Sequence, residues 1–355
     1  MSALTIVMYH YVRDLARSRY PGLKALTVDA FEGQLDYVAR HYRVCSVREV
    51  VAASRGEYRL PPNACLLTFD DGFLDHFRTV LPRLVARGFT AGFYPPAAAI
   101  EGRRLLDTHK IQLILAACDD TGKLARRLLD LIDARRDDDA MPSGEALWRR
   151  HAVASRFDGP EVIFVKRVLQ RGLPEATRSA LAQRLLEEYV GVDEATLAHE
   201  LYMDTEQLRC MARLGMDVGA HGAAHVWLDS LARPAQAAEI DATLAFLARI
   251  HGRPPVDWVM CYPFGGYDAT TLELVMERGC ALGLTTRVDV ARDLRRPLEL
   301  PRLDKNRANG SSARLTTNSP VRWMLAKVSL RRPSGLKLTA NMQSGGSSQN
   351  TLKKL

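Results

Sequence analysis

Two adjacent carboxylates, Asp70 and Asp71, are the residues of this sequence whose types and spacing point most directly to chemistry. They follow the apolar run Ala64–Leu67, which is typical of a buried strand that ends at a reactive tip. Successive side chains of a strand point to opposite faces, so both carboxylates can serve one site only if the strand stops there. Gly72 suits the turn that this requires. Two anions this close repel, and the repulsion is relieved when one binds a metal ion and the other acts as a base.

Two histidines four residues apart form a second candidate group. His221 and His225 come directly after the apolar run Met216–Ala220. On a helical turn this spacing places both imidazoles on one face, where they can bind one metal ion. The ends of parallel strands in an α/β barrel open into the same mouth. One carboxylate and two neutral imidazoles then supply three ligands and leave a position for water, which is the pattern of a catalytic zinc-type site.

The elements that must position these residues are predicted to be parallel βα units. Apolar runs alternate with amphipathic helical patterns, and helix N-caps stand at Thr27 and Ser46. We predict helices over 27–41, 46–53, 77–87, 205–214, 234–250 and 269–278, and strands over 4–9, 42–46, 90–94, 216–220, 258–262, 281–285 and 300–303. Between about 102 and 203 the pattern is helical throughout. We interpret that segment as an insertion into the α/β fold. Its role would be either packing or oligomerisation, or that of a lid that sets substrate choice.

Composition and charge narrow the class of protein. The chain has 355 residues, of which 47% are hydrophobic and 25% are charged, as in a globular protein with a large core. Its net charge of +8 arises at residues 305–355, which hold ten Lys or Arg and no Asp or Glu. The rest of the chain is near neutral, so we expect no nucleic-acid partner. Six scattered cysteines and the lack of a recognisable signal or membrane span favour a cytoplasmic protein.

Three ordered motifs give the chain a resemblance to the polysaccharide deacetylases of the NodB-homology type, carbohydrate esterase family 4. Its Thr-Phe-Asp-Asp-Gly sequence at 68–72 resembles the first motif. His221 and His225 resemble the second, with Gly222 in place of the usual hydroxyl residue. Tyr-Pro-Phe-Gly at 262–265 resembles the third. Tyr9-His10, near the start of the chain, also resembles the Tyr-His sequence that is common near the start of such proteins.

The resemblance covers residues 4–100 and 203–304 and implies a fold. We expect an α/β protein with a distorted (β/α) barrel, NodB-like and related to the TIM barrel. This deacetylase domain would span residues 1–304, with the all-helical insertion at about 102–203. The basic segment 305–355 is expected to be a disordered tail, with weak contact to a membrane surface through an amphipathic helix as the alternative.

The resemblance also implies roles for the first two motifs. Asp70 would be the general base toward a water on the metal ion. Asp71, His221 and His225 would be the metal ligands. The ion would be divalent, with zinc favoured and cobalt, nickel or manganese as alternatives. The reaction would be hydrolysis of the acetamide of an N-acetylated sugar, which releases acetate and a free amine.

The third motif is expected to contact the substrate. The backbone N–H of Tyr262 would help to hold the oxyanion, and Pro263, Phe264 and Gly265 would line the sugar-binding groove. The family's usual late Leu-x-x-His motif has no match, because no histidine follows His251. The residue that acts as general acid toward the leaving amine is therefore not identified by these motifs.

Two further residues are possible accessories. His10, at another strand end, could be the general acid or could make a structural hydrogen bond, and Asp70 acting twice is the alternative to His10 as acid. Arg302, after the last strand, could orient Asp70 or could be a surface arginine. For the remaining histidines and Lys110 we expect solvated or packing roles; these histidines are His41, His76, His109, His151, His199 and His251.

The predicted function is that of a hydrolase acting on carbon–nitrogen bonds other than peptide bonds. Its substrate would be an N-acetylated sugar in a polysaccharide or in a biosynthetic precursor. Two alternatives stay open: a catalytically silent carbohydrate-binding relative, and a metal-dependent amidase with a non-sugar substrate. The sequence leaves the oligomeric state open.

Overall fold

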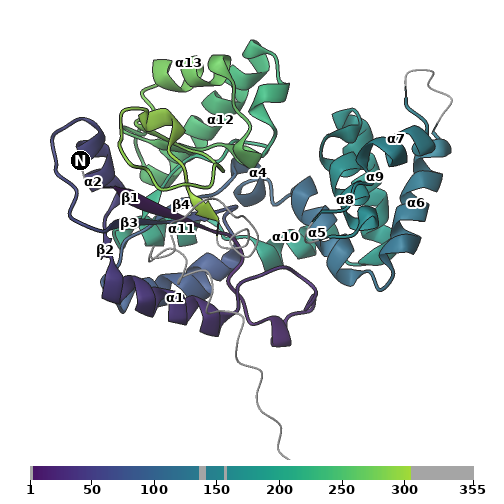
Figure 1. Ribbon diagram of the computed structural model, residues 1–355, viewed down its shortest axis with the longest axis horizontal. Helices are drawn as coiled ribbons and strands as arrows, with labels where there is room; N and C mark the ends of the chain where they lie inside the picture. The colour runs from purple at the N-terminus through teal and green to yellow at the C-terminus, as the bar shows by residue number, and fades with distance from the viewer. Residues whose placement is uncertain (1–2, 136–140, 156–157, 305–355) are drawn as a thin grey trace, which may run out of the picture.

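The computed structural model describes residues 3–135, 141–155 and 158–304, which form a mixed α/β fold (Figure 1). Five strands form one parallel sheet in the order β5-β4-β3-β1-β8, with β2 beside β3, and β6 pairs with β7. The strands are β1 (Leu4–Tyr9), β2 (Arg43–Val44), β3 (Ala64–Asp70), β4 (Gly92–Tyr94), β5 (Asp217–Val218), β6 (Val259–Cys261), β7 (Leu282–Leu284) and β8 (Leu303–Asp304).

Single parallel bridges join the two sheets into a ring. Ala220, just after β5, pairs with Met260 of β6, and Leu300, just before β8, pairs with Leu284 of β7. Since β8 pairs with β1, the ring closes. The predicted distorted (β/α) barrel is confirmed. Because all the pairs between its strands are parallel, their C-terminal ends open at one mouth.

The first two long strands form the rigid centre of this barrel. Every residue of β1 and β3 is buried, as expected for parallel strands that are covered on both faces. The rings of Tyr9, Phe69 and Phe93 stack across three neighbouring strands, with centroids 5.0 and 4.9 Å apart. The strand ends that carry the candidate site are therefore fixed by a packed core.

Helices cover the outside of the barrel, with α1 on one side and α12 and α13 on the other (Figure 1). The Thr27 side chain accepts from the Ala30 N–H at the start of α1, and Ser46 and Glu49 form a capping box at α2. These helices are α1 (Val28–His41), α2 (Val47–Ser54), α3 (Leu81–Val85), α4 (Ala97–Ile100), α11 (Thr205–Arg213), α12 (Arg233–His251) and α13 (Ala269–Glu277).

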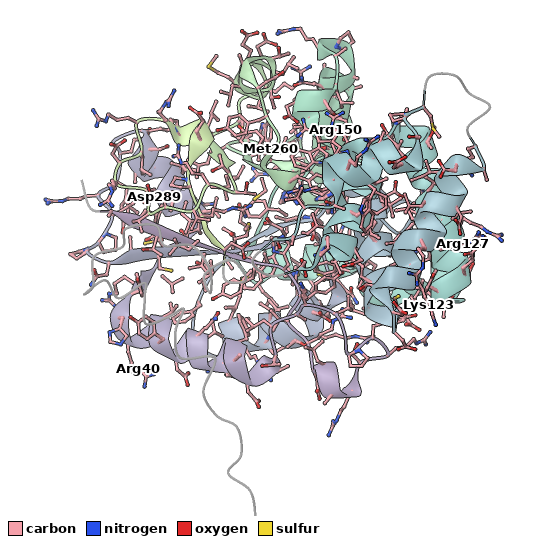
Figure 2. All side chains as sticks on the ribbon, turned by 45° about the vertical axis from the view of Figure 1, so that its right-hand side comes forward. Arg40, Lys123, Arg127, Arg150, Met260 and Asp289 are labelled. Carbon is pink, nitrogen blue, oxygen red and sulfur yellow. The ribbon has the colours of Figure 1, made fainter. Side chains whose placement is uncertain are left out.

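A separate group of helices lies beside the barrel (Figure 1). In the described part of residues 107–201 every regular element is helical, as predicted, although the assignment of this segment as an insertion remains a prediction. Lys123 and Arg127 of α6 point outward from it (Figure 2). Its helices are α5 (Asp107–Ala117), α6 (Thr121–Asp133), α7 (Gly144–His151), α8 (Pro160–Arg167), η3 (Val168–Gly172), α9 (Glu175–Tyr189) and α10 (Glu194–Leu201).

Several predicted boundaries were wrong. The helix predicted over 77–87 is a π-helical turn, His76–Val80, followed by the short α3, because Pro82 lacks the N–H of a continuous helix. The last strand begins at Leu303 rather than at residue 300. None of the described helices has the length and apolar character needed to cross a membrane. The tail at 305–355 lies outside the described residues.

Candidate metal centre

The turn after β3 separates the two adjacent carboxylates. Asp70 is the last residue of the strand, and Asp71 and Gly72 both have left-handed backbone conformations, with φ of +74° and +68°. A Cβ at Gly72 would lie 2.7 Å from the Cβ of Pro95, so glycine is required there for space as well as for conformation. The predicted turn is present. A left-handed aspartate is strained, and this strain is typical of functional sites.

The two histidines of the second motif lie on an irregular loop, so the expectation that they share a helical turn was wrong. Gly222 and His225 have φ of +75° and +56°, which interrupts any helix. Glycine in place of a hydroxyl residue fits this left-handed position. The Glu239 carboxylate of α12 accepts from the N–H groups of Ala223 and Ala224, each at 3.0 Å, and so holds the loop in place.

Three side-chain atoms converge where the turn and the loop meet. Asp71 Oδ1 lies 3.4 Å from the Nε2 atoms of both His221 and His225, and these nitrogens are 3.2 Å apart. Ligands at about 2.0–2.1 Å from a tetrahedral zinc ion would lie about 3.3–3.4 Å from one another. The three atoms therefore have the spacing of neighbouring ligands around one small divalent cation, and all three residues are buried.

The hydrogen bonds around these atoms leave their lone pairs facing one another. The Nδ1–H of His221 donates to the Cys261 carbonyl at 2.7 Å, so Nε2 of the neutral ring is a bare acceptor. Asp71 Oδ1 is buried and has no hydrogen-bond partner among the described residues. A buried carboxylate oxygen that faces a bare imidazole nitrogen, with no donor of its own, is unfavourable unless a cation occupies the centre. The residues present thus fit a metal ion.

The pKa values of the three residues suit this role. Burial alone would raise the pKa of Asp71, but His109 and His221 hold it well below its usual range. Burial, with the charge of His221, lowers the pKa of His225 to about 3, so this ring is neutral. Burial opposes protonation of His221 too, yet the nearby carboxylates of Asp71 and Asp70 raise its pKa overall. A proton and a cation would compete for the same nitrogen of His221, so metal binding at this site is expected to depend on pH.

Asp70 forms a buried ion pair with Arg302. Arg302 NH1 and NH2 donate to the two oxygens of Asp70 at 2.9 and 2.8 Å, and both residues are almost fully buried. The alternative of a surface arginine is excluded. Burial would raise the pKa of Asp70, but the Arg302 guanidinium and His221 outweigh it and lower the pKa. Asp70 is therefore an ionised carboxylate beside the three converging atoms.

The expected oxyanion role of the Tyr262 N–H does not agree with the structure. This N–H donates to the Leu284 carbonyl at 3.2 Å, in continuation of the β6–β7 ladder, and the Tyr262 hydroxyl donates to the Leu298 carbonyl. Sequence reasoning missed this because it did not predict which amides the strand register would use. The side chain of Tyr262 is fully buried behind the turn.

The next amide of that turn is differently placed. Pro263 has no N–H, and the N–H groups of Gly265 and Gly266 donate to the Tyr262 and Pro263 carbonyls. The N–H of Phe264 has no partner among the described residues. Phe264 has φ of +57°, and its ring centroid lies 4.5 Å from that of His225. The Phe264 N–H is therefore a free backbone donor in the same turn as the Tyr262 N–H, which the sequence had predicted to contact the oxyanion.

Two cavities are lined by residues of the site or its edge, and residues of the helical group line both. A cavity of about 180 Å³ is lined by His225, Phe264 and Trp227. A larger one, of about 450 Å³, is lined by His10 at one end. Ile111 and Gln170 line both cavities. Of the three predicted groove residues, Phe264 lines a cavity, whereas Pro263 and Gly265 shape the turn.

His10 lies at the edge of the site. Its Nε2 is 4.0 Å from Asp71 Oδ2, and its side chain is 31% exposed, whereas the three converging residues are buried. Of the solvated or packing role expected for His109, the packing role agrees with the structure, but the ring also contacts a residue of the site. The His109 ring is fully buried, and Nε2 lies 3.2 Å from Asp71 Oδ2. No motif marks His109, so only the fold reveals this contact.

Comparisons with known proteins agree with the resemblance stated from the motifs. A family model described as polysaccharide deacetylase matches residues 175–282, which include the second and third motifs. The solved structure of the Streptococcus pyogenes deacetylase PplD in complex with acetate is 17% identical, with a TM-score of 0.50, covering 85% of this chain and 92% of that one. IcaB from Ammonifex degensii is 19% identical, with a TM-score of 0.53, covering 92% and 98%. A search of curated proteins found no match.

Together these findings confirm the similarity to polysaccharide deacetylases. The family match covers less than half of the chain, and the two structures are similar in fold. The match does not reach Asp70 and Asp71. Their contribution to the site rests on the geometry described above.

Proposed function

We propose that this protein is a metal-dependent deacetylase that hydrolyses the acetamide of an N-acetylated sugar, in a polysaccharide or in one of its precursors. The convergence of Asp71, His221 and His225 beside the ionised Asp70 carries this proposal. The family match supports a carbohydrate substrate. One carboxylate and two imidazoles favour zinc, with cobalt, nickel and manganese as the other candidates.

A divalent metal bound by these residues would lower the pKa of a water molecule and polarise the acetamide carbonyl. Asp70 accepts the proton of the attacking water. Each of its oxygens accepts one N–H of Arg302, so each keeps a lone pair for this step. Its lowered pKa keeps the carboxylate ionised at neutral pH, and Arg302 fixes its orientation.

Two further groups act on the substrate in the later steps, the Phe264 N–H on the oxyanion and His10 on the leaving nitrogen. The Phe264 N–H donates to the oxyanion as the carbonyl carbon becomes tetrahedral. His10 then gives a proton to the amide nitrogen as the carbon–nitrogen bond breaks, so that acetate and a free amine leave. His10 suits this role because its Nε2 lies 4.0 Å from Asp71 Oδ2, its side chain is partly exposed, and it lines a cavity.

The first test is acetate release from a panel of N-acetylhexosamine substrates by metal-stripped protein, with and without added Zn²⁺ or Co²⁺. We expect release only with metal, and a loss of about 10²–10⁴-fold in kcat for Asp70→Asn, the range of general-base catalysis. Asp75→Asn is the matched control, because Asp75 also binds an arginine, Arg13, through both oxygens but lies outside the ligand set. Zinc binding by Asp70→Asn should persist.

Three outcomes would contradict the proposal in different ways. Acetate release by the metal-stripped protein without added metal would show that the reaction does not need a metal ion. Release from simple acetamides but from no sugar would indicate an amidase with another substrate. Metal binding without release from any substrate would favour a silent carbohydrate-binding relative.

The role of His10 can be tested through the leaving group. His10→Gln is expected to lower kcat on an N-acetyl sugar by about 10²-fold or more, since an amine leaves only when protonated. An aryl acetate ester needs no acid to expel its phenolate, so its hydrolysis should change little. Equal losses on both substrates would show that His10 acts before the bond breaks.

A further inference from the structure

The helical group sends one histidine into the metal centre. His109, in the first turn of α5, is fully buried, and its Nε2 lies 3.2 Å from Asp71 Oδ2. The other oxygen of this carboxylate, Oδ1, is the one that faces His221 and His225. Nδ1 of His109 lies 2.5 Å from the hydroxyl of Tyr202. The two oxygens of Asp71 therefore have different surroundings.

The chemistry of Asp71 fixes the direction of its hydrogen bond with His109. Ionised Asp71 can only accept, so Nε2 of His109 carries the hydrogen and donates it. On the other side of the ring, Nδ1 shares a hydrogen bond with the Tyr202 hydroxyl. Burial raises the pKa of Tyr202 well above its usual value, so this hydroxyl keeps its hydrogen. The Tyr202 oxygen accepts in turn from the Leu106 N–H at 3.1 Å.

We propose that His109 is a positioning residue for the metal centre: through its Nε2–H it holds Asp71 Oδ2, so that the carboxylate presents Oδ1 alone to the cation. This inference rests on the proposed metal-dependent function. A carboxylate held by one oxygen binds a metal through the other, which leaves a coordination position open for water. His109 itself is not a ligand, because the nitrogen nearest to the site carries a hydrogen.

The surrounding contacts fix both His109 and Tyr202 next to the turn after β3. Tyr202, directly after α10, forms a β-bridge with Phe73, and the Met203 N–H donates to the Gly72 carbonyl at 3.0 Å. The start of α5 is held by Glu194, which accepts from the Leu105 N–H at 3.0 Å and pairs with Lys110 at 3.2 Å.

The two ends of the helical group thus meet at one ligand. His109 follows the start of the group by a few residues, and Tyr202 follows its last helix. A segment that served packing alone would have no need to place a fully buried imidazole against a metal-binding carboxylate. In this arrangement the helical group contributes to the metal centre as well as to the cavities beside it.

The test measures metal binding directly, on the full chain and without any substrate. Zinc dissociation constants, from competition with a chromophoric chelator, are compared for the wild-type protein, His109→Leu, His109→Gln and Tyr202→Phe. We expect His109→Leu to weaken zinc binding about 10–100-fold, the usual effect of losing a group that orients a ligand. His109→Gln keeps a side-chain N–H donor and should recover most of this loss. Tyr202→Phe should give a smaller loss.

The Co²⁺ absorption spectrum reports the coordination of the ion itself. In His109→Leu both oxygens of Asp71 are free to bind, so the visible bands should weaken as the coordination number rises. Tyr11→Phe is the matched control, because it removes a hydroxyl from the same aromatic cluster, one that donates to Gln112 at 2.8 Å. It should leave the zinc affinity and the spectrum unchanged.

Each contrary outcome has one meaning. If His109→Leu binds zinc like the wild type and has the same cobalt spectrum, His109 does not position Asp71, while the proposed function stands. If His109→Gln is as weak as His109→Leu, the N–H donor role is wrong, and direct ligation or packing explains the loss. If the wild-type protein binds neither ion, the metal centre of the proposed function fails first.

Discussion

Arg302→Met is expected to lower the free energy of unfolding by about 3–5 kcal/mol, because it leaves the carboxylate of Asp70 buried without its counterion. Arg302 and Asp70 are 0% and 1% exposed, and two N–H···O bonds of 2.9 and 2.8 Å join them. Arg302 also donates to the Thr285 carbonyl at 3.0 Å, so the substitution leaves that group without its donor. Denaturant unfolding of the metal-stripped protein measures the change.

A double-mutant cycle separates the pair from the individual residues. Asp70→Asn alone should also destabilise, since it leaves the buried guanidinium unpaired. Asp70→Asn combined with Arg302→Met should cost clearly less than the two single changes added together. The matched control is Arg278→Met, because Arg278 binds both oxygens of Asp241 at 2.6 and 3.1 Å near the surface. It should cost less than about 1 kcal/mol.

The pH dependence of this effect has a definite sign. The folded-state pKa of Asp70 lies below its unfolded value of about 3.9. The stabilisation from the pair is therefore fully present above that pH and is lost as the pH falls through the folded-state pKa. The difference between wild type and Arg302→Met should shrink in acid. Strictly additive costs in the cycle, or an Arg302→Met cost like that of the surface control, would contradict the assignment.

Much of the site could be predicted because its residues stand directly after apolar runs. The parallel alternation placed Asp70, Asp71 and His221 at strand ends, and parallel strands bring such ends to one mouth whatever their distance in sequence. The same argument marked His10. These predictions needed only the order of the elements, which short apolar runs indicate well.

The details that failed depend on local conformation and register. A spacing of four residues looks the same on a helix and on a loop, so His221 and His225 gave no sign of their irregular backbone. The Tyr262 N–H was assigned to the substrate without knowing that the β6–β7 ladder uses it. Hydrogen-bond register is set by the pairing of strands, and the sequence of one strand does not contain it.

Two partners of the site are distant in the chain: the sequence left Arg302 open between orienting Asp70 and a surface position, and it gave no sign of the contact that His109 makes. Arg302 reaches Asp70 across 232 residues, and His109 reaches Asp71 across 38, from a segment that the motifs do not cover. Both side chains are polar and fully buried. A buried polar side chain is stable only if it is hydrogen-bonded or ion-paired, and only the folded structure shows which group is its partner.

The largest functional loss is expected when one of the proposed metal ligands is removed. His225→Asn should weaken zinc binding about 10²–10³-fold, because a zinc site worth about 10–16 kcal/mol over four ligands loses about 2.5–4 kcal/mol with one of them. Of the two histidines, His225 is the better target. Its Nδ1 is buried and has no partner among the described residues, whereas His221 donates to the Cys261 carbonyl.

The substitution is chosen so that the fold survives it. His225 has φ of +56°, and asparagine adopts this left-handed conformation more readily than most residues. His251→Asn is the matched control, since His251 hydrogen-bonds to the Val218 carbonyl and is not one of the converging residues. The control should bind zinc and release acetate like the wild type, whereas His225→Asn should do both poorly at micromolar metal.

Excess metal then distinguishes lost affinity from lost chemistry. If His225 only holds the ion, acetate release by His225→Asn should rise as Zn²⁺ or Co²⁺ is increased, and its midpoint should follow the measured dissociation constant. If activity stays low although the site is filled with metal, the His225 imidazole also affects the reactivity of the bound ion and not only its affinity. Unchanged zinc affinity in His225→Asn would mean that these three residues do not form the metal centre, and the function proposed from their convergence would lose its basis.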